Sequence, residues 1–134
     1  MALLRAREVV MARFRPMLAR HDITEQQWRA LRELAEGGPM EATELANRAS
    51  ILPPSLTRML KTMEDRGLIL RGRVEGDGRR VMLSISAAGT TLIDELAPER
   101  QAIYEAIEQR FGATQHEELL DMLDALIKSD ANGS

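Results

Sequence analysis

Residues 54–68 carry the pattern that decides the fold, and they read Pro-Ser-Leu-Thr-Arg-Met-Leu-Lys-Thr-Met-Glu-Asp-Arg-Gly-Leu. Apolar side chains recur at the i, i+3, i+4, i+7 spacing of one helix face, at Leu56, Met59, Leu60 and Met63. The opposite face carries Pro54, Thr57, Arg58, Lys61 and Thr62. The stretch therefore predicts a helix that stops at a glycine, packs on one side and leaves the other side free for a partner.

The free face indicates the kind of partner. Short hydroxyl side chains beside arginine and lysine suit a helix in the major groove of DNA, because they reach base edges and phosphate oxygens together. The net charge of −3 is uneven: residues 87–134 hold ten acidic and three basic residues, whereas residues 58–80 hold seven basic and four acidic. This local surplus favours double-stranded DNA, and an ordinary solvated charge pattern is the alternative.

Composition limits the remaining possibilities. A chain of 134 residues with 44% hydrophobic content suits one domain with its own core. No apolar run approaches the ~20 residues that cross a bilayer, and arginines interrupt the first 20 residues, so we expect a cytoplasmic protein without a membrane segment. The chain has no cysteine, and His21 and His116 are too far apart in sequence to build a metal site alone. We therefore expect no metal and no cofactor.

Helices precede the central stretch. The pattern predicts a first helix over residues 3–21 and a second that opens at Thr24, where Thr-Glu-Gln-Gln is a capping box, and runs to Gly37. A short helix over residues 41–49 and a turn over residues 50–52 follow. Pro53 then suits the first position of the helix described above.

After Gly67 the period changes from helical to two. Alternating residues predict strands at 69–74 and 80–85, with a Gly-rich, charged tip at residues 75–79. A hairpin directly after a helix-turn-helix is a wing. The predicted fold class is therefore mainly α with a small β-hairpin wing, a winged helix-turn-helix.

The remaining residues are predicted to be helical. Ser86 caps a helix to about Phe111, and Thr114-Gln115-His116-Glu117 is a second capping box that opens the last helix. These two helices have apolar faces that a compact winged helix does not cover, and a second copy of the chain is the simplest cover. We therefore expect a homodimer.

Several short motifs carry a resemblance to a known family. They are Glu44-Leu45-Ala46, Pro54-Ser55-Leu56-Thr57-Arg58, Glu64-Asp65-Arg66-Gly67-Leu68-Ile69, Asp77-Gly78-Arg79-Arg80 and Ile85-Ser86. In this order and spacing they resemble the MarR family of transcriptional regulators. The stretches Phe14-Arg15-Pro16, Thr24-Glu25-Gln26-Gln27-Trp28-Arg29 and Ile51-Leu52-Pro53-Pro54-Ser55-Leu56-Thr57 resemble, more narrowly, the subgroup of repressors of homoprotocatechuate (hydroxyphenylacetate) degradation operons.

The resemblance implies a dimer that binds a pseudo-palindromic operator. One helix of each subunit would enter a major groove, and each wing would place an arginine in the adjacent minor groove. The predicted DNA-binding residues are Pro54, Ser55, Thr57, Arg58, Lys61, Thr62, Arg73, Asp77, Arg79 and Arg80. Arg79 is the expected wing arginine and Asp77 its orienting carboxylate, although Asp77 and Gly78 also fit a plain hairpin turn. For Arg80 a phosphate contact and a solvent-facing position without a partner are equal alternatives.

One position departs from the family pattern. Leu52 stands where a serine or asparagine commonly caps the helix, so about 1 kcal/mol of local stability is absent.

The resemblance also implies an effector, a small aromatic carboxylate bound between the dimer helices and the DNA-binding lobe. The candidate residues are Arg15, His21, Trp28 and Arg32, because an arginine would pair the carboxylate and an indole would stack on the ring. Each has an alternative. Trp28 fits a hydrophobic staple with Ile23, His21 fits a helix-end position, and the arginines fit surface charges.

We interpret the chain as a ligand-responsive repressor of an aromatic-acid catabolic operon. The alternatives are a winged helix that contacts only proteins and a MarR-type regulator that answers another ligand. An enzyme is not expected, because the chain has neither a cysteine nor a Gly-rich phosphate loop. The predicted organisation is N-terminal dimerisation and support helices (1–36), the winged helix-turn-helix (37–86), C-terminal dimerisation helices (87–130) and a disordered tail (131–134).

Overall fold

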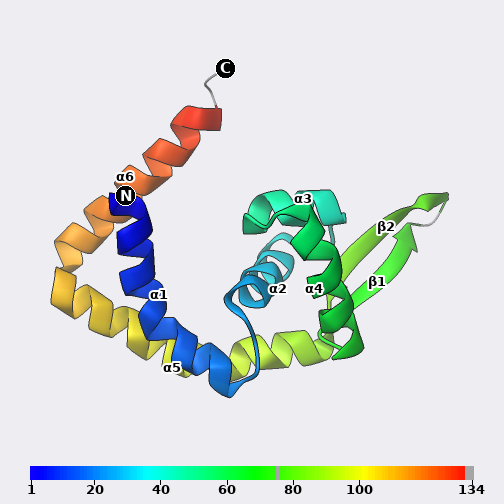
Figure 1. Ribbon diagram of the computed structural model, residues 1–134, viewed down its shortest axis with the longest axis horizontal. Helices are drawn as coiled ribbons and strands as arrows, with labels where there is room; N and C mark the ends of the chain where they lie inside the picture. Colours follow the sequence, from blue (N-terminus) through cyan, green and yellow to red (C-terminus); the bar gives the residue numbers. More distant parts are fainter. Residues whose placement is uncertain (75, 132–134) are drawn as a thin grey trace. The chain divides into compact units, whose positions relative to one another are not determined.

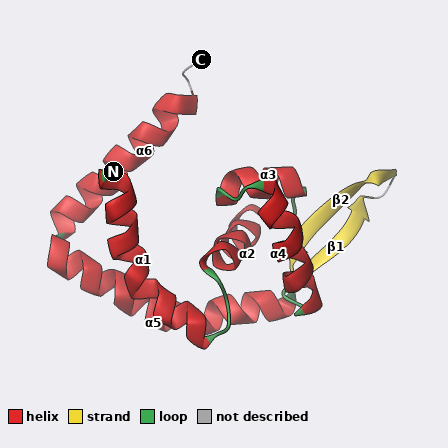
Figure 2. Cartoon of the chain, in the orientation of Figure 1, coloured by secondary structure: helices red, strands yellow, loops and turns green. Residues whose placement is uncertain are grey.

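The computed structural model describes residues 1–74 and 76–131, and for Asp77, Arg79 and Ala131 it describes the backbone alone. The elements of the described residues are α1 (Ala2–Arg20), α2 (Glu25–Gly37), α3 (Ala42–Ala49), α4 (Pro53–Asp65), β1 (Ile69–Val74), β2 (Asp77–Ile85), α5 (Ala87–Phe111) and α6 (Ala113–Ala131). Contacts group the chain into two compact units, Met1–Pro98 and Glu99–Ser134, with the boundary inside α5. Helices dominate and the strands form a single hairpin (Figure 2), which confirms the predicted fold class.

The core of the first unit lies among α2, α3, α4 and the base of the hairpin (Figure 1). The apolar face predicted for α4 is confirmed, since Leu56, Met59, Leu60 and Met63 are all buried. Leu31 on α2 and Leu45 on α3 are completely buried in the same core. Burial of each such side chain stabilises the fold by about 1.5–3 kcal/mol. This core therefore holds α4 in place with its polar face exposed.

The start of α2 forms the predicted capping box. The backbone N–H of Gln27 donates to Thr24 Oγ1 (3.1 Å), and the backbone N–H of Thr24 donates to Gln27 Oε1 (3.0 Å). Two N–H groups at this helix terminus are thereby satisfied. After α2, Gly38 takes a φ of 75°, which favours glycine.

The start of α4 has no such cap. Leu52 occupies the N-cap position, makes no side-chain cap hydrogen bond, and is 76% exposed. Pro53 holds the first helical position, as predicted. The helix ends at Asp65, and Gly67 follows with a φ of 72°.

The hairpin is longer than predicted on its second strand, which begins at Asp77 rather than at residue 80. The reason is an irregularity in the pairing: the register shifts between Arg73 and Val74, so that Val74 pairs with Asp77, and Gly76 turns the chain with a φ of 83°. Position 75 of the predicted tip lies outside the described residues. Period-two alternation did not detect the three extra positions, because a bulge breaks the alternation.

Ser86 caps α5, as predicted, and also joins two other segments. Its Oγ accepts a hydrogen bond from the backbone N–H of Gly89 (3.0 Å) and donates one to the carbonyl oxygen of Gly67 (2.6 Å). The first turn of α5 is thus fixed against the loop after α4. The approach is close at Gly89, where a Cβ would lie 2.7 Å from Cγ1 of Ile85 and closer still to the carbonyl oxygen of Leu68.

The predicted second capping box at Thr114 is wrong. Helix α6 begins at Ala113, and the carbonyl of Gly112 accepts the first helical hydrogen bond, from the backbone N–H of His116 (2.9 Å). Gly112 takes a φ of 107°, which a residue with a side chain rarely adopts, so the turn before α6 ends on the glycine and Thr114 falls inside the helix. The helix continues to Ala131, and residues 132–134 of the predicted tail lie outside the described residues.

Among the described residues, none of the helices is both long and apolar enough to cross a membrane.

Candidate nucleic-acid interface

The reading face is the exposed side of α4, which carries Pro54, Ser55, Thr57, Arg58, Lys61 and Thr62. All six side chains are exposed, so the structure brings these predicted DNA-binding residues together on one surface. The side chain of Arg58 makes no hydrogen bond or ion pair within the described part of the chain, whereas Lys61 Nζ lies 3.8 Å from Oδ2 of Asp65. Such exposed pairs are weak, so both cations are available to phosphate.

Thr62 differs from the other hydroxyl residues of the reading face. Its Oγ1 donates to the carbonyl oxygen of Arg58, one turn earlier (3.2 Å). The hydroxyl hydrogen is therefore engaged by the helix backbone, and the lone pairs of the oxygen stay free to accept a hydrogen bond. In this conformation Thr62 presents an acceptor to a partner.

The wing residues are held in different ways. Arg73 Nη1 donates to the carbonyl oxygen of Gly78 across the hairpin (2.6 Å) and so braces the tip. Arg80 Nε donates to Oε1 of Glu41, at the N-cap of α3 (2.9 Å), so of the two alternatives for Arg80 the solvent-facing position without a partner is wrong. Period-two patterning could not show this, because Glu41 is 39 positions away in sequence. The side chains of Asp77 and Arg79 lie outside the described residues.

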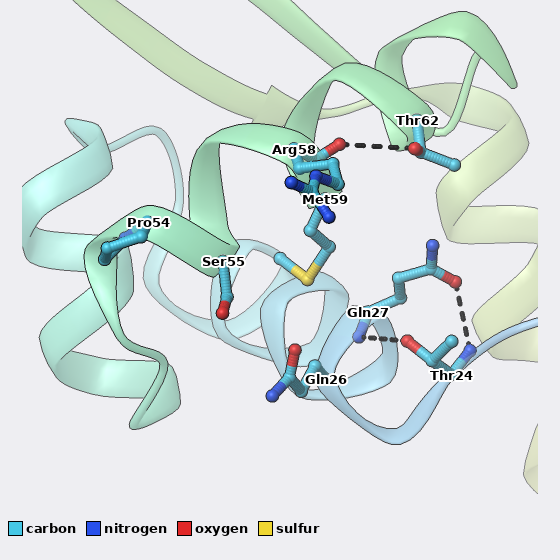
Figure 3. Close-up of a pocket in the computed structure, with 8 residues that line it drawn as sticks. All are labelled: Thr24, Gln26, Gln27, Pro54, Ser55, Arg58, Met59 and Thr62. Carbon is cyan, nitrogen blue, oxygen red and sulfur yellow. Dashed lines mark hydrogen bonds between the residues drawn. The ribbon is translucent and has the colours of Figure 1, made fainter.

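A shallow hollow of about 390 Å³ opens between the reading face and the start of α2 (Figure 3). Its lining residues are Thr24, Gln26, Gln27, Pro54, Ser55, Arg58, Met59 and Thr62. None of the eight is acidic, and Arg58 is the cation among them. Four of these residues were predicted to bind DNA, whereas Thr24, Gln26 and Gln27 were predicted to form the cap of α2.

Two arginines fix α4 relative to the preceding helices. Arg29 on α2 donates from Nε to the carbonyl oxygen of Ala49 (2.8 Å) and from Nη2 to that of Ser50 (3.4 Å), in the turn before α4. Arg66, just after α4, donates from Nη1 to the carbonyl oxygen of Asp22 (2.5 Å). Both ends of α4 are therefore attached to α2 or to the loop that leads into it.

Glu25 is a functional candidate that the sequence analysis missed. It lies between Arg7 and Arg29, with Oε2 2.5 Å and 3.0 Å from their guanidinium nitrogens, and Arg15 lies 3.6 Å from Oε1. Burial pushes the pKa of Glu25 up, but the hydrogen bond from Arg7 and the charges of the three arginines outweigh it, so the pKa lies below the ordinary value. In sequence Glu25 reads only as a favourable charge at a helix N-terminus.

Two of the four effector candidates lie together. The guanidinium of Arg32 lies over the indole of Trp28, 5.9 Å from the ring centroid, and its Nη2 is 2.5 Å from Oε1 of Glu36. Trp28 is half-buried. Glu25, Trp28 and Arg32 follow the i, i+3, i+7 spacing, so they share one face of α2.

The other two candidates lie apart from this pair. Arg15 forms a double hydrogen bond with Glu8 (2.9 Å each), which raises the pKa of the guanidinium and lowers the pKa of the Glu8 carboxyl. Within the described residues, Arg15 contacts the α2 face through Glu25 (3.6 Å). His21 is the C-cap of α1, where its carbonyl oxygen accepts a bond from Arg66 (3.4 Å). Within the described residues no group of three acidic or histidine side chains could hold a metal ion.

Comparison with known proteins shows which family the chain is similar to. The MarR family model matches residues 23–81, which run from the start of α2 into β2. The chain is 43% identical over 126 residues to the HTH-type transcriptional regulator FarR of Neisseria gonorrhoeae, with 94% of this chain and 86% of FarR covered. It is 42% identical over 126 residues to the homoprotocatechuate degradative operon repressor of Escherichia coli, with 94% and 85% covered.

A solved structure extends the likeness to three dimensions. NadR in complex with 4-hydroxyphenylacetate matches with a TM-score of 0.90 and 40% identity, covering 99% of this chain and 97% of NadR. These matches confirm the resemblance to the family and its subgroup drawn from the motifs. The chain belongs to the MarR family of transcriptional regulators.

Proposed function

We propose that the protein is a homodimeric repressor that binds a pseudo-palindromic operator and releases it when a small aromatic carboxylate binds. The observation that carries the proposal is the reading face of α4, where Arg58 and Lys61 are exposed beside Ser55 and Thr57. A helix with this face suits the major groove, since its basic side chains reach phosphates while its short polar side chains reach base edges.

The proposed wing contact uses Arg79, with Asp77 orienting its guanidinium. A narrow A·T-rich minor groove concentrates negative potential and attracts arginine. The brace from Arg73 to the Gly78 carbonyl supports this proposal, because it fixes the backbone beside Arg79. Arg80 contributes to phosphate binding only if its bond to Glu41 opens or is shared.

The proposed homodimer rests on exposed apolar side chains of α6. Leu119, Leu120, Leu126 and Ile127 are 42–69% exposed, although they form one stripe along the helix. Exposed apolar surface of this kind marks an interface. Two copies would place two reading helices on successive major grooves, about 34–36 Å apart.

The proposed effector site is the face of α2 with Trp28 and Arg32. The indole offers a surface for an aromatic ring, and Arg32 offers a cation for a carboxylate once its pair with Glu36 is exchanged. NadR binds 4-hydroxyphenylacetate and the Escherichia coli relative is a repressor of homoprotocatechuate degradation, which supports a phenolic or catecholic acid as the class of ligand.

The test is a gel shift on the protein's own upstream intergenic DNA against a random duplex of equal length. We expect preference for the intergenic DNA, and loss of the shifted band on addition of 4-hydroxyphenylacetate or homoprotocatechuate. No preference for any duplex, even at low salt, would contradict the DNA-binding proposal. Preference that none of the aromatic acids changes would contradict the effector class alone.

A further inference from the structure

Gln27 has an amide nitrogen whose hydrogen-bonding capacity is unused. The side chain is 7% exposed, and its Oε1 accepts the backbone N–H of Thr24 in the capping box (3.0 Å). Because that backbone group is a donor, only the oxygen of the amide can face it, and the orientation of the amide is fixed by chemistry. Nε2 must therefore point the other way, and Figure 3 shows it directed away from Thr24 toward the helix that carries Thr62.

The Nε2 atom of Gln27 points into the hollow beside the reading face. Within the described part of the chain Nε2 has no acceptor, and Gln27 is one of the lining residues. Nε2 keeps contact with solvent at this hollow, so a water or a ligand bound there can supply the acceptor. The side chain is thus prepared to donate to something in this space.

The charges and hydrogen-bond donors around the hollow favour an anion as its ligand. Arg58 brings a guanidinium with no acidic partner among the described residues, Ser55 brings an exposed hydroxyl, and no carboxylate lines the space. The hollow also lies at the N-terminus of α2, where the helix dipole favours negative charge. Glu25, in the same turn, opposes this weakly, because its charge is met by Arg7 and Arg29.

We infer that this hollow binds a phosphate of the DNA backbone, with Gln27 Nε2 and Arg58 as donors from two different helices. The inference rests on the proposed function, since it requires α4 to lie in a major groove. A phosphate at the edge of that groove would then meet α2 at its N-terminus. Gln27 would add affinity without sequence preference, because phosphates are the same at every position.

The variant Gln27→Glu tests this with little risk to the fold. Glutamate is the other residue that closes a capping box at this position, so the bond to Thr24 is retained, while a carboxylate oxygen replaces the donor. Gln109→Glu is the matched control, because it makes the same charge change at an exposed position of α5 outside the hollow. Thermal unfolding of both variants and sedimentation of both confirm that fold and assembly are retained.

Fluorescence anisotropy measures binding of the wild type and both variants to operator and random duplexes over a salt series. We expect Gln27→Glu to weaken binding to both duplexes by at least about tenfold. Its log K against log salt slope should be smaller than that of the wild type by about 0.9 for each bound subunit, because the new carboxylate offsets the charge that Arg58 brings to the phosphate. Gln109→Glu should match the wild type.

Duplexes with single methylphosphonate linkages then locate the contact. One linkage in each half-site should weaken the wild type and have no such effect on Gln27→Glu. Equal binding by the two variants, or the same methylphosphonate profile for wild type and Gln27→Glu, would overturn the inference. So would inorganic phosphate that shifts the Gln27 side-chain amide resonances while every methylphosphonate duplex binds normally, because the hollow would then hold free phosphate. A wild type that binds no duplex fails the proposed function instead.

Discussion

Arg58 differs from the other basic residues around α3 and α4 because, among the described residues, its side chain has neither an ion pair nor a hydrogen bond, whereas Arg66 is bonded to backbone carbonyls. Arg48 pairs with Glu44, Arg71 with Glu64, and Arg80 with Glu41. An arginine in such a pair must give up part of its interaction before it binds phosphate. Arg58 gives up none among the described residues, so it should dominate the electrostatic contribution of the reading face.

Arg58→Ala should therefore weaken operator binding by about 1–3 kcal/mol if the guanidinium reaches a base edge. Its free energy of unfolding should stay within about 0.5 kcal/mol of the wild type, because the side chain that is removed is exposed and has no partner among the described residues. Anisotropy and urea unfolding measure the two quantities. Arg13→Ala, at an exposed position of α1, is the control and should change neither.

Leu52→Ser should stabilise the protein by about 1 kcal/mol, because serine supplies the side-chain cap that α4 lacks. Since Leu52 is 76% exposed, little apolar burial is lost. Leu52→Ala is the control, as alanine removes the same exposed surface without adding a cap. Equal urea midpoints for the two variants would show that the cap does not form.

At the scale of elements, sequence patterns predicted every helix and both strands, because each has a periodic apolar face or a local cap. Thr24, Pro53 and Ser86 all mark helix starts correctly through interactions within four residues. The errors arose at the hairpin tip and at the start of α6, where glycine conformations decide the boundary. Partners distant in sequence, such as Glu41 for Arg80, were also invisible, since no local pattern encodes them.

The candidate site likewise contains some residues that local patterns predicted and others that they missed. The reading face of α4 follows from helical spacing, and all six predicted residues are exposed together. Glu25 and Gln27 were missed because their roles depend on burial and on helices that approach from elsewhere in the chain. A local motif shows which residues cap a helix. It does not show which polar atom of a capping side chain remains able to bind a ligand.

Gly89→Ala should destabilise the protein by about 1–3 kcal/mol, because the new methyl group would press on the carbonyl of Leu68 and on Ile85. Gly72→Ala is the control: no atom lies within 4 Å of a Cβ there, so stability should be unchanged or slightly higher. Urea unfolding compares the two. A Gly89→Ala variant as stable as the wild type would mean that α5 moves away from the hairpin at little cost.

The cluster around Glu25 should make stability sensitive to acid. The pKa of Glu25 is lower in the folded chain than its ordinary value of 4.5, so its contribution is fully present above pH 4.5 and is lost as the pH falls through the folded pKa. Glu25→Gln should therefore be less stable than the wild type at pH 7, and the difference should shrink below pH 4.5. Thermal unfolding at several pH values measures this, and a constant difference would exclude the charge as the cause.

At the scale of the whole molecule, the exposed stripe of α6 predicts assembly. Leu120→Glu should produce monomers, because it places a charge on apolar surface that a partner would cover. Ala125→Glu, on the opposite side of the helix, is the control and should leave the dimer intact. Sedimentation at micromolar concentration measures the state, and operator affinity should fall with dimer content. A Leu120→Glu variant that sediments like the wild type would place the interface elsewhere.

The hydroxyl group of Ser86 gives the molecule a built-in reporter. The Ser86 oxygen is bonded both to the amide of Gly89 and to the carbonyl of Gly67. If α5 separates from the loop after α4, one of these two hydrogen bonds must therefore break. The rate at which the Gly89 amide exchanges its hydrogen with deuterated solvent therefore registers disturbance of this junction. A change in the exchange rate of this one amide, far in sequence from Trp28 and Arg32, would thus show that a bound small molecule alters the structure next to α4.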